Sequence, residues 1–248
     1  MKIVALIPSR YGSTRFAGKP LAQIAGKSMI RRVHENVTKA EGLTDVVVAT
    51  DDKRIADAVM AFGGKVVMTG IENRSGTDRA ADAAEQMGLA PEDIVVNVQG
   101  DQPLLNPRCI DALIAPFSGL PDLDMTTLAF KTIDKREIAD PKDVKVTFDH
   151  QGYALYFSRS PIPVARDAST AFDTYKHLGF YAYKKRFLDT FSRLPEGKLE
   201  AIEKLEQLRV LEHGHRILVV ITPYDSPEVD LPEDIPRIEG ILAETGGA

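Results

Sequence analysis

The fold is decided by the run Ile3-Val4-Ala5-Leu6-Ile7, which is followed directly by the loop Pro8-Ser9-Arg10-Tyr11-Gly12. A continuous apolar and β-branched run is typical of a strand buried on both faces, as in parallel sheets. Similar runs stand at 46–49, 65–68 and 94–98, and stretches with helical spacing separate them at 29–39, 53–62 and 77–87. This alternation predicts an α/β fold, a mostly parallel sheet with helices on both faces.

The pattern changes after about Pro121. We expect strands at 125–130, 144–148, 153–158 and 217–221, and helices at 184–191, 199–213 and 232–242. The helix at 199–213 is predicted from an apolar stripe with helical spacing, namely Ile202, Leu205, Leu208 and Leu211. The expected organisation is a nucleotide-binding core at 1–121, an inserted β-rich part at 122–215 and a return to the core at 216–248.

The composition narrows the class of protein. The 248 residues carry 31 Lys and Arg against 36 Asp and Glu, a net charge of -5. A mildly acidic chain is a poor candidate for wrapping nucleic acid, so we expect no nucleic-acid partner. The single Cys109 excludes disulfides within the chain and cysteine-rich zinc sites. No apolar run reaches the roughly 18–20 residues that cross a bilayer, and Pro8 ends the first run too early for a signal peptide. We therefore expect a cytoplasmic protein with no membrane partner.

The first loop carries three cations, Arg10, Arg15 and Lys19, together with Gly12 and Gly18. Ligands of open α/β sheets bind where strands end, and glycines let backbone N–H groups approach phosphate oxygens that cations neutralise. The loop lacks the spacing of a Walker A motif, and no G-x-G-x-x-G fingerprint occurs in the chain. Two interpretations remain open at this point: a polyphosphate site, or a solvated basic loop.

Two aspartates are candidate ligands of Mg²⁺. Asp101 directly follows the buried run at 94–98, and Asp230 lies near the C-terminus. Mg²⁺ in proteins is usually held by one or two carboxylates together with substrate phosphates. Either aspartate could instead cap a helix. A common ion requires the two carboxylates to lie within about 10 Å of each other, since each ligand oxygen sits at about 2.1 Å from the metal.

Three further positions have a structural and a functional interpretation. Ser75-Gly76-Thr77-Asp78-Arg79 either caps a helix or reads the edge of a base. His177 stands alone among aromatic residues, and the scattered histidines do not predict zinc. Arg159 either binds a carboxylate through both of its N–H arms or is an ordinary surface cation.

Longer motifs connect these positions with a known family. The first loop resembles the N-terminal signature of sugar nucleotidyltransferases. The chain as a whole, over about residues 2–240, resembles the 3-deoxy-manno-octulosonate cytidylyltransferase (CMP-Kdo synthetase) family. The motifs that carry this resemblance are Ser75–Arg79, Val98-Gln99-Gly100-Asp101, Tyr153-Ala154-Leu155-Tyr156-Phe157-Ser158-Arg159, His177-Leu178-Gly179, Leu205-Glu206-Gln207-Leu208-Arg209 and Val229-Asp230 with Pro232-Glu233-Asp234.

The resemblance implies a Rossmann-like nucleotidyltransferase fold with an inserted sugar-binding and dimerisation part, and a homodimer. It implies Mg²⁺-dependent transfer of a cytidylyl group from CTP to Kdo, or to 8-amino-8-deoxy-Kdo, for lipopolysaccharide biosynthesis. Arg10 and Lys19 would hold the triphosphate, and Asp101 and Asp230 would bind Mg²⁺; these four would be the catalytic residues. The cytidine side would be lined by Pro8, Ser75, Gly76, Arg79 and Gln99. The sugar acid would be faced by Arg159, His177, Tyr181, Glu206 and Gln207.

Three positions depart from the family pattern. Phe16-Ala17 stands where Leu-Pro is usual, Gln102 replaces an acidic residue, and Leu231 replaces a threonine. Gln102 leaves one less negative charge near the metal. Two other functions stay open: a CMP-sugar synthetase of the sialic-acid type, and a nucleotide-binding sensor without catalysis.

Overall fold

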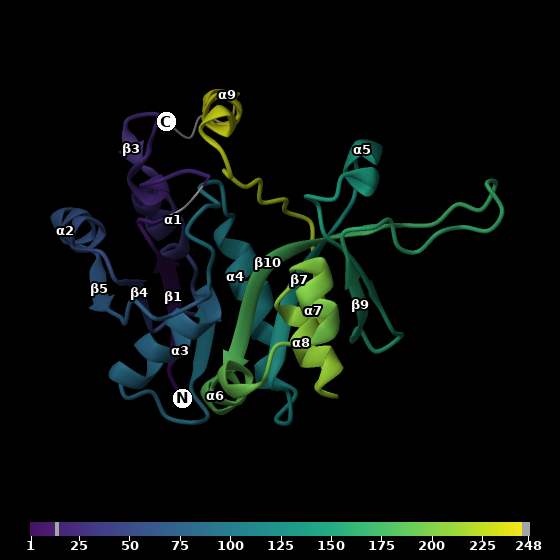
Figure 1. Ribbon diagram of the computed structural model, residues 1–248, viewed down its shortest axis with the longest axis horizontal. Coiled ribbons are helices and arrows are strands. Elements are labelled where there is room, and N and C mark those ends of the chain that lie inside the picture. The colour runs from purple at the N-terminus through teal and green to yellow at the C-terminus, as the bar shows by residue number, and fades with distance from the viewer. Residues whose placement is uncertain (13–14, 245–248) are drawn as a thin grey trace.

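The computed structural model describes residues 1–12 and 15–244, so Ser13 and Thr14 of the first loop lie outside the described residues. A nine-stranded sheet forms the centre of the molecule (Figure 1). Its main path is β11 (Leu218–Thr222), β7 (Met125–Lys131), β10 (Tyr175–Lys184), β6 (Ile94–Asn97), β1 (Ile3–Ser9), β4 (Asp45–Thr50) and β5 (Lys65–Met68). Every pairing along this path is parallel except those of β10, which runs antiparallel to both of its neighbours.

Helices cover both faces of the sheet, as predicted. Residues of α1 (Met29–Val37), α2 (Lys53–Ala61) and α4 (Pro107–Ile114) pack against one face, where Ala5 and Ile7 of β1 point. Residues of α3 (Gly76–Gln86), α6 (Lys185–Arg193) and α8 (Gln207–Glu212) pack against the other, together with Val4 and Leu6. Successive side chains of a strand point to opposite faces, so the apolar run at 3–7 supplies both halves of the core.

Most of the further elements are short. They include β2 (Gln23–Ile24), β3 (Lys27–Ser28), α5 (Lys135–Ala139), α7 (Lys198–Glu203), the ten-residue α9 (Ile235–Glu244) and the 3-10 turns Lys19–Leu21, Ala115–Ser118 and Pro232–Asp234. The predicted final helix therefore begins as a 3-10 turn before continuing as α9. No helix in the described ranges 1–12 and 15–244 is long and apolar enough to cross a membrane.

Side-chain caps fix where several helices begin. Asp52 accepts a hydrogen bond from the backbone N–H of Arg54, and Asn106 caps α4 ahead of Pro107 in the same way. Ser75 accepts a hydrogen bond from the backbone N–H of Asp78 at the start of α3. Each cap satisfies one of the N–H groups that the first turn of a helix leaves without a partner. The structural interpretation of Ser75 is therefore correct, and it leaves room for a functional one.

The structure corrects two expectations about the second half. The sequence did not indicate β10, the longest strand, whose pairing with β7 shifts register between His177 and Tyr181. The single helix expected at 199–213 was wrong: Lys204 adopts a left-handed conformation (φ 53°), which ends α7, and α8 begins at Gln207. The left-handed region is unfavourable within a helix of L-residues, so the chain turns there and Leu205 and Glu206 lie between two short helices.

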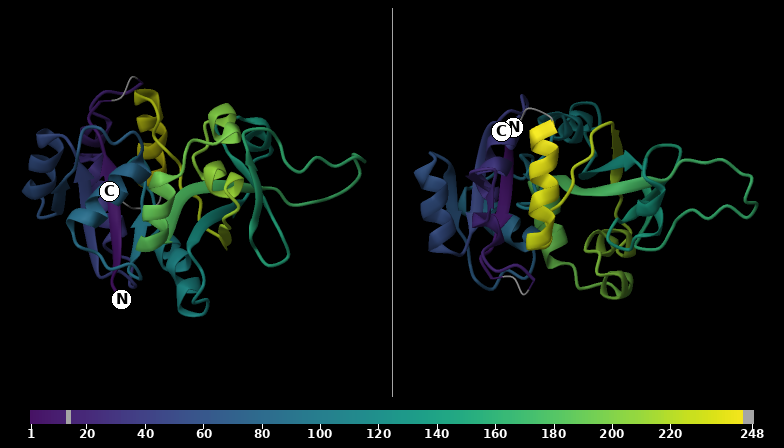
Figure 2. Two further views of the ribbon diagram at one scale, coloured as in Figure 1. Left: turned by 60° about the horizontal axis from the view of Figure 1, so that its bottom comes forward. Right: turned by 90° about the horizontal axis from the view of Figure 1, so that it is seen from above.

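Beyond the main path, the two predicted strands at 144–148 and 153–158 appear as β8 (Lys145–Phe148) and β9 (Ala154–Ser158), which form an antiparallel hairpin around the turn at 149–152. Residues 159–174 then form a long loop that projects away from the sheet, clear in every view (Figures 1 and 2). The division into parts at 121 and 215 stays a prediction. Strands β7 and β10 belong to its middle part and yet lie in the same sheet as β1.

Candidate active site

The site forms where β1 and β6 end side by side. The two strands are parallel, with Leu6 opposite Asn97, so Pro8 near the end of β1 and Gln99 just after β6 lie at the same edge of the sheet. A Cβ atom added to Gly100 would lie 3.0 Å from Ser9 Oγ and 3.3 Å from the Pro8 carbonyl oxygen. Glycine at position 100 therefore lets the loop carrying Asp101 approach the end of β1, as expected for a ligand site at the carboxyl ends of strands.

A cavity of about 250 Å³ opens at this edge. Its wall includes every residue expected on the nucleotide side: Pro8, Arg10, Lys19, Ser75, Gly76, Arg79, Gln99 and Asp101. Arg79 is buried and donates to Thr69 Oγ1 at 2.6 Å and to Asp51 at 3.0 Å, so most of its charge is already compensated. The other cations in this wall are Arg10, Arg15 and Lys19 of the first loop and the exposed Arg74, which pairs with Asp78.

A second, larger cavity of about 690 Å³ adjoins the first. Its wall includes all the residues expected to face the sugar: Arg159, His177, Tyr181, Glu206 and Gln207. The two cavities share Arg15, Gln99 and Asp101 in their walls. Two ligands bound in the two cavities would therefore meet beside Asp101.

The Lys19 ammonium brings the two candidate metal ligands together. Lys19 Nζ lies 2.8 Å from Asp101 Oδ2 and 3.8 Å from Asp230 Oδ1, and it also donates to the Val229 carbonyl oxygen. The carboxylates are therefore closer to each other than the limit of about 10 Å set by a common ion. Asp101 does not act as the helix cap considered above, since Asn106 caps α4. Asp230 forms an ion pair with Arg15 (3.2 Å).

The donor set fits Mg²⁺. No group of three or more His, Cys, Asp or Glu side chains that could hold a metal ion occurs within residues 1–12 and 15–244. Two carboxylates already converge on one cationic group, Lys19 Nζ. A pair of carboxylates completed by phosphate oxygens is the usual protein environment of Mg²⁺, whereas an all-protein cage is not. Asp101 and Asp230 could thus hold the ion when a nucleotide supplies the remaining ligands.

Arg159 is held in place by backbone carbonyl oxygens. Its guanidinium donates to Glu203 O (2.7 Å) and Pro141 O (2.9 Å), and among the described residues no carboxylate forms an ion pair with it. The fully buried Lys145 donates from Nζ to the carbonyl oxygens of Asp140, Asp143 and Arg159. Arg159 therefore carries a fixed positive charge in the wall of the larger cavity, suited to a carboxylate ligand.

His177 is buried and neutral. The Thr127 hydroxyl donates to the Phe180 carbonyl oxygen (2.8 Å), so it accepts from the Nε2–H of His177 (2.9 Å). Burial lowers the pKa of His177 from 6.5 to about 3. Nearby, the buried Gln207 Nε2 has no hydrogen-bond partner among the described residues. This wall of the cavity therefore offers an amide donor to a polar ligand.

The depressed pKa of His177 has a consequence for stability. Below pH 6.5 the His177 imidazole binds a proton in the unfolded chain, whereas in the folded chain it stays neutral down to about pH 3. The free energy of unfolding therefore decreases as the pH falls through this window. Between pH 7.5 and 5.5 the loss is about 1.4 kcal/mol. The free energy of unfolding is measured in urea at both pH values. The decrease on going to pH 5.5 should be smaller in His177→Gln than in the unchanged protein, by about that amount. Equal decreases in the two proteins would contradict a neutral, buried His177.

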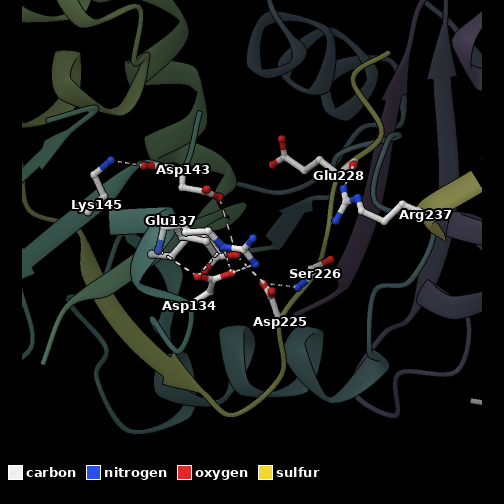
Figure 3. A network of polar contacts seen from close by, with 10 residues as sticks. Asp134, Glu137, Asp143, Lys145, Asp225, Ser226, Glu228 and Arg237 are labelled. Atoms are coloured by element: carbon white, nitrogen blue, oxygen red, sulfur yellow. Dashed lines mark hydrogen bonds and ion pairs between the residues drawn. The ribbon is translucent and has the colours of Figure 1, made fainter. Parts of the chain in front are cut away.

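The sequence analysis missed Glu228, which lies in the wall of the larger cavity (Figure 3). The buried Gln102 donates to Glu228 Oε1 (2.9 Å) and accepts from Ser226 Oγ (3.2 Å). Burial and the neighbouring Asp101 carboxylate raise the pKa of Glu228 to about 7. Gln102 carries no negative charge where the family pattern has an acidic residue, but the carboxyl group of Glu228 contacts it. Only the position of Glu228 two residues before Asp230 could have suggested it.

An acidic cluster at the same cavity was also missed. The labelled side chains of Glu137, Asp143 and Asp225 lie close together (Figure 3). They surround the ammonium of Lys176, at 2.9 Å from Glu137, 3.1 Å from Asp225 and 3.8 Å from Asp143. Three carboxylates face one ammonium group, so this part of the wall carries excess negative charge. The four residues come from α5, the segment before β8, β10 and the segment after β11, which no local pattern connects.

Comparison with known proteins matches this geometry. The family model described as "Cytidylyltransferase" matches residues 4–217. The chain belongs to the cytidylyltransferase family. A 3-deoxy-manno-octulosonate cytidylyltransferase of Desulfosudis oleivorans is 68% identical over 98% of each chain. An 8-amino-3,8-dideoxy-manno-octulosonate cytidylyltransferase of Shewanella amazonensis is 57% identical, over 98% of this chain and 99% of that protein.

Solved structures agree with this assignment. A CMP:2-keto-3-deoxy-manno-octonic acid synthetase complexed with CTP superposes with a TM-score of 0.92 at 41% identity, over 99% of this chain and 100% of that one. A 4-diphosphocytidyl-2C-methyl-D-erythritol synthase, at 15% identity and a TM-score of 0.66, shares the fold. This cytidylyltransferase is thus a nucleotidyltransferase enzyme. The predicted resemblance and the nucleotidyltransferase fold are confirmed.

Proposed function

We propose that this cytidylyltransferase transfers the cytidylyl group of CTP to the anomeric hydroxyl of Kdo or of 8-amino-8-deoxy-Kdo. The hydroxyl oxygen forms a bond to the α-phosphorus, the bond from that phosphorus to the β-phosphate oxygen breaks, and the hydroxyl proton is released. The products are the CMP-sugar and pyrophosphate. The observation that carries the proposal is the pair of adjoining cavities that meet beside Asp101 and Lys19.

The residues of each cavity suit one substrate. In the smaller cavity, Arg10 and Lys19 would neutralise the triphosphate, while Pro8, Ser75, Gly76, Arg79 and Gln99 would line the cytidine. In the larger cavity, Arg159 would hold the sugar carboxylate, since its guanidinium donates to backbone carbonyl oxygens while the nearby Glu203 carboxylate accepts from the Arg159 backbone N–H. Tyr181, Glu206, Gln207 and the neutral His177 would contact the sugar hydroxyls.

Asp101 and Asp230 would hold Mg²⁺, which would lower the pKa of the attacking hydroxyl and offset charge on the phosphates. Lys19 keeps both carboxylates near one point before the nucleotide enters. Binding the two substrates on either side of Asp101 converts their encounter into a reaction between held partners, which alone accounts for a large share of a typical rate enhancement. No covalent intermediate with the protein is needed.

The acidic cluster bears on the identity of the sugar. Glu137, Asp143 and Asp225 leave excess negative charge beside Lys176 in the larger cavity. A sugar acid carrying an ammonium group is attracted to such a wall, whereas Kdo brings only its negative charge. This charge balance favours the 8-amino sugar, while the relative from Desulfosudis oleivorans is named for Kdo.

A comparison of acceptors tests the proposal. Pyrophosphate release is measured with CTP and Mg²⁺ in the presence of Kdo, 8-amino-Kdo or a sialic acid. We expect release with one or both of the first two acceptors, and its loss when Mg²⁺ is chelated. Release with the sialic acid alone would identify a different CMP-sugar synthetase. CTP binding without release with any acceptor would identify a sensor.

We also propose a homodimer that acts in the cytoplasm, in the synthesis of lipopolysaccharide. Support for the dimer comes from the loop at 159–174, which projects from the sheet (Figure 2) and exposes Val164 (78%) and Phe172 (46%). Apolar side chains on a projecting segment are favourable where a second subunit covers them. Sedimentation equilibrium should then give twice the 27.2 kDa mass of one chain.

A further inference from the structure

Glu206 lies in the wall of the larger cavity but is bonded to the segment that lines the smaller one. Its Oε1 accepts a hydrogen bond from Ser75 Oγ and its Oε2 accepts one from Thr77 Oγ1, both at 2.8 Å. Ser75 and Gly76 line the smaller cavity. The carboxylate is thus a direct link between the two cavities, across about half the length of the chain.

We propose that Thr77 is a positioning residue for the acceptor, and that Thr77, Ser75 and Glu206 together couple acceptor binding to nucleotide binding. This inference rests on the proposed function, in which the nucleotide occupies the smaller cavity and the sugar acid the larger. A nucleotide that orders the segment at 75–77 would also fix Glu206 where the sugar meets it.

Thr77 is placed to act on the substrates through Glu206, and its hydroxyl also lies beside the buried Tyr183. Its side chain is 2% exposed and belongs to the walls of neither cavity among the described residues. Its hydroxyl donates to a charged acceptor, a stronger type of hydrogen bond than one between neutral groups. Loss of that hydroxyl would leave one oxygen of Glu206 unheld while leaving the contacts of either substrate intact.

The position of Glu206 makes the two hydroxyls important. The left-handed Lys204 ends α7, so Glu206 lies in the short connection before α8 and not within a regular helix. A side chain in such a connection owes its orientation to its hydrogen bonds more than to the backbone around it.

Because coupling between two binding sites is reciprocal, a nucleotide that improves sugar binding must be bound more tightly when sugar is present.

The test uses Thr77→Val, with Thr77→Ser as the variant that keeps the hydroxyl. Thr132→Val is the matched control, since the Thr132 hydroxyl has no hydrogen-bond partner among the described residues. Calorimetric titrations with 8-amino-Kdo and with Kdo are made in Mg²⁺, with and without a CTP analogue carrying a methylene bridge between the α- and β-phosphates. Steady-state kinetics and thermal melting are measured on the same proteins.

In the unchanged protein we expect the analogue to tighten sugar binding about fivefold or more. In Thr77→Val the analogue should change sugar affinity by a factor close to one, and the KM for the sugar should rise about tenfold. Its affinity for the analogue alone should stay within about twofold of that of the unchanged protein. Thr77→Ser should restore both quantities, and Thr132→Val should match the unchanged protein.

Two outcomes would overturn the inference: an unchanged protein whose sugar affinity does not respond to the analogue, or a Thr77→Val protein that keeps the full response. If Thr77→Val melts far below the unchanged protein, the same titrations are made on Glu206→Gln, whose amide nitrogen cannot accept from a hydroxyl. A retained response there would likewise count against the coupling. Failure of the proposed function is distinct, because the unchanged protein would then release no pyrophosphate with either acceptor.

Discussion

Replacing Asp101 by Asn should lower kcat by about 100-fold or more, with little change in thermal stability. Removal of one group that stabilises charge in the reaction commonly has an effect of this size. Asp101 stands in the walls of both cavities and 2.8 Å from Lys19 Nζ, where the two substrates would meet. Asparagine has nearly the same shape and can still accept a hydrogen bond from Lys19, so the fold should survive while the negative charge is lost.

The measurement is the rate of pyrophosphate release over a range of Mg²⁺ concentrations. Asp57→Asn is the matched control, because Asp57 lies on α2 and, within residues 1–12 and 15–244, pairs only with the exposed Lys53. It should leave the rate unchanged. If Asp101→Asn reached the full rate at saturating Mg²⁺, Asp101 would not belong to the metal site.

Lys19→Ala should reduce kcat/KM for CTP by about 100-fold, since the carboxylates of Asp101 and Asp230 then face the triphosphate without the ammonium between them, and only Asp230 keeps an ion pair, with Arg15. The ammonium that lies between Asp101 and Asp230 would be gone, and two like charges in one cavity repel each other and the incoming phosphates. The loss should appear mainly in CTP binding or turnover, as a weaker affinity for CTP in calorimetry and a higher KM for CTP.

Lys27→Ala provides the comparison for this variant. Lys27 is a neighbouring cation that pairs with Glu35 outside both cavities, and its removal should leave CTP kinetics within about twofold of the unchanged protein. Equal CTP kinetics for Lys19→Ala and Lys27→Ala would remove Lys19 from the proposed phosphate-binding loop.

The elements predicted well from the sequence are those whose local pattern matches their burial. The run at 3–7 is apolar throughout because both of its faces are covered, and Asp52 caps the helix that follows the strand at 46–49. Strand β10 was missed because lysine, histidine and glycine interrupt its aromatic residues, and its pairing with β7 shifts register at the site. Shifts of this kind are frequent beside active sites, where they redirect side chains.

The break between α7 and α8 was missed for a different reason. Ile202, Leu205, Leu208 and Leu211 keep helical spacing across it, but Ile202 is 76% exposed in the structure. Periodicity alone cannot indicate that one residue, Lys204, leaves the helical conformation. That turn places Glu206 where Ser75 and Thr77 reach it.

In the site, Asp101 was predicted because it follows the end of a buried strand. Asp230 was supported by the family resemblance more than by the residues next to it in the sequence. The contact of Gln102 with Glu228 joins positions 126 residues apart and depends on the tertiary fold alone. The acidic cluster around Lys176 has the same origin.

The edge position of β11 determines when the enzyme can first work during its synthesis. Asp230 follows β11, which pairs with β7, and lies 3.8 Å from Lys19 although more than 200 residues separate the two in the chain. A nascent chain released up to the middle of the sheet already contains the phosphate-binding loop and Asp101, but it lacks the second carboxylate. Domains generally fold as the ribosome releases them. Fragments that end before Asp230 would therefore lack the second of the two proposed Mg²⁺ ligands.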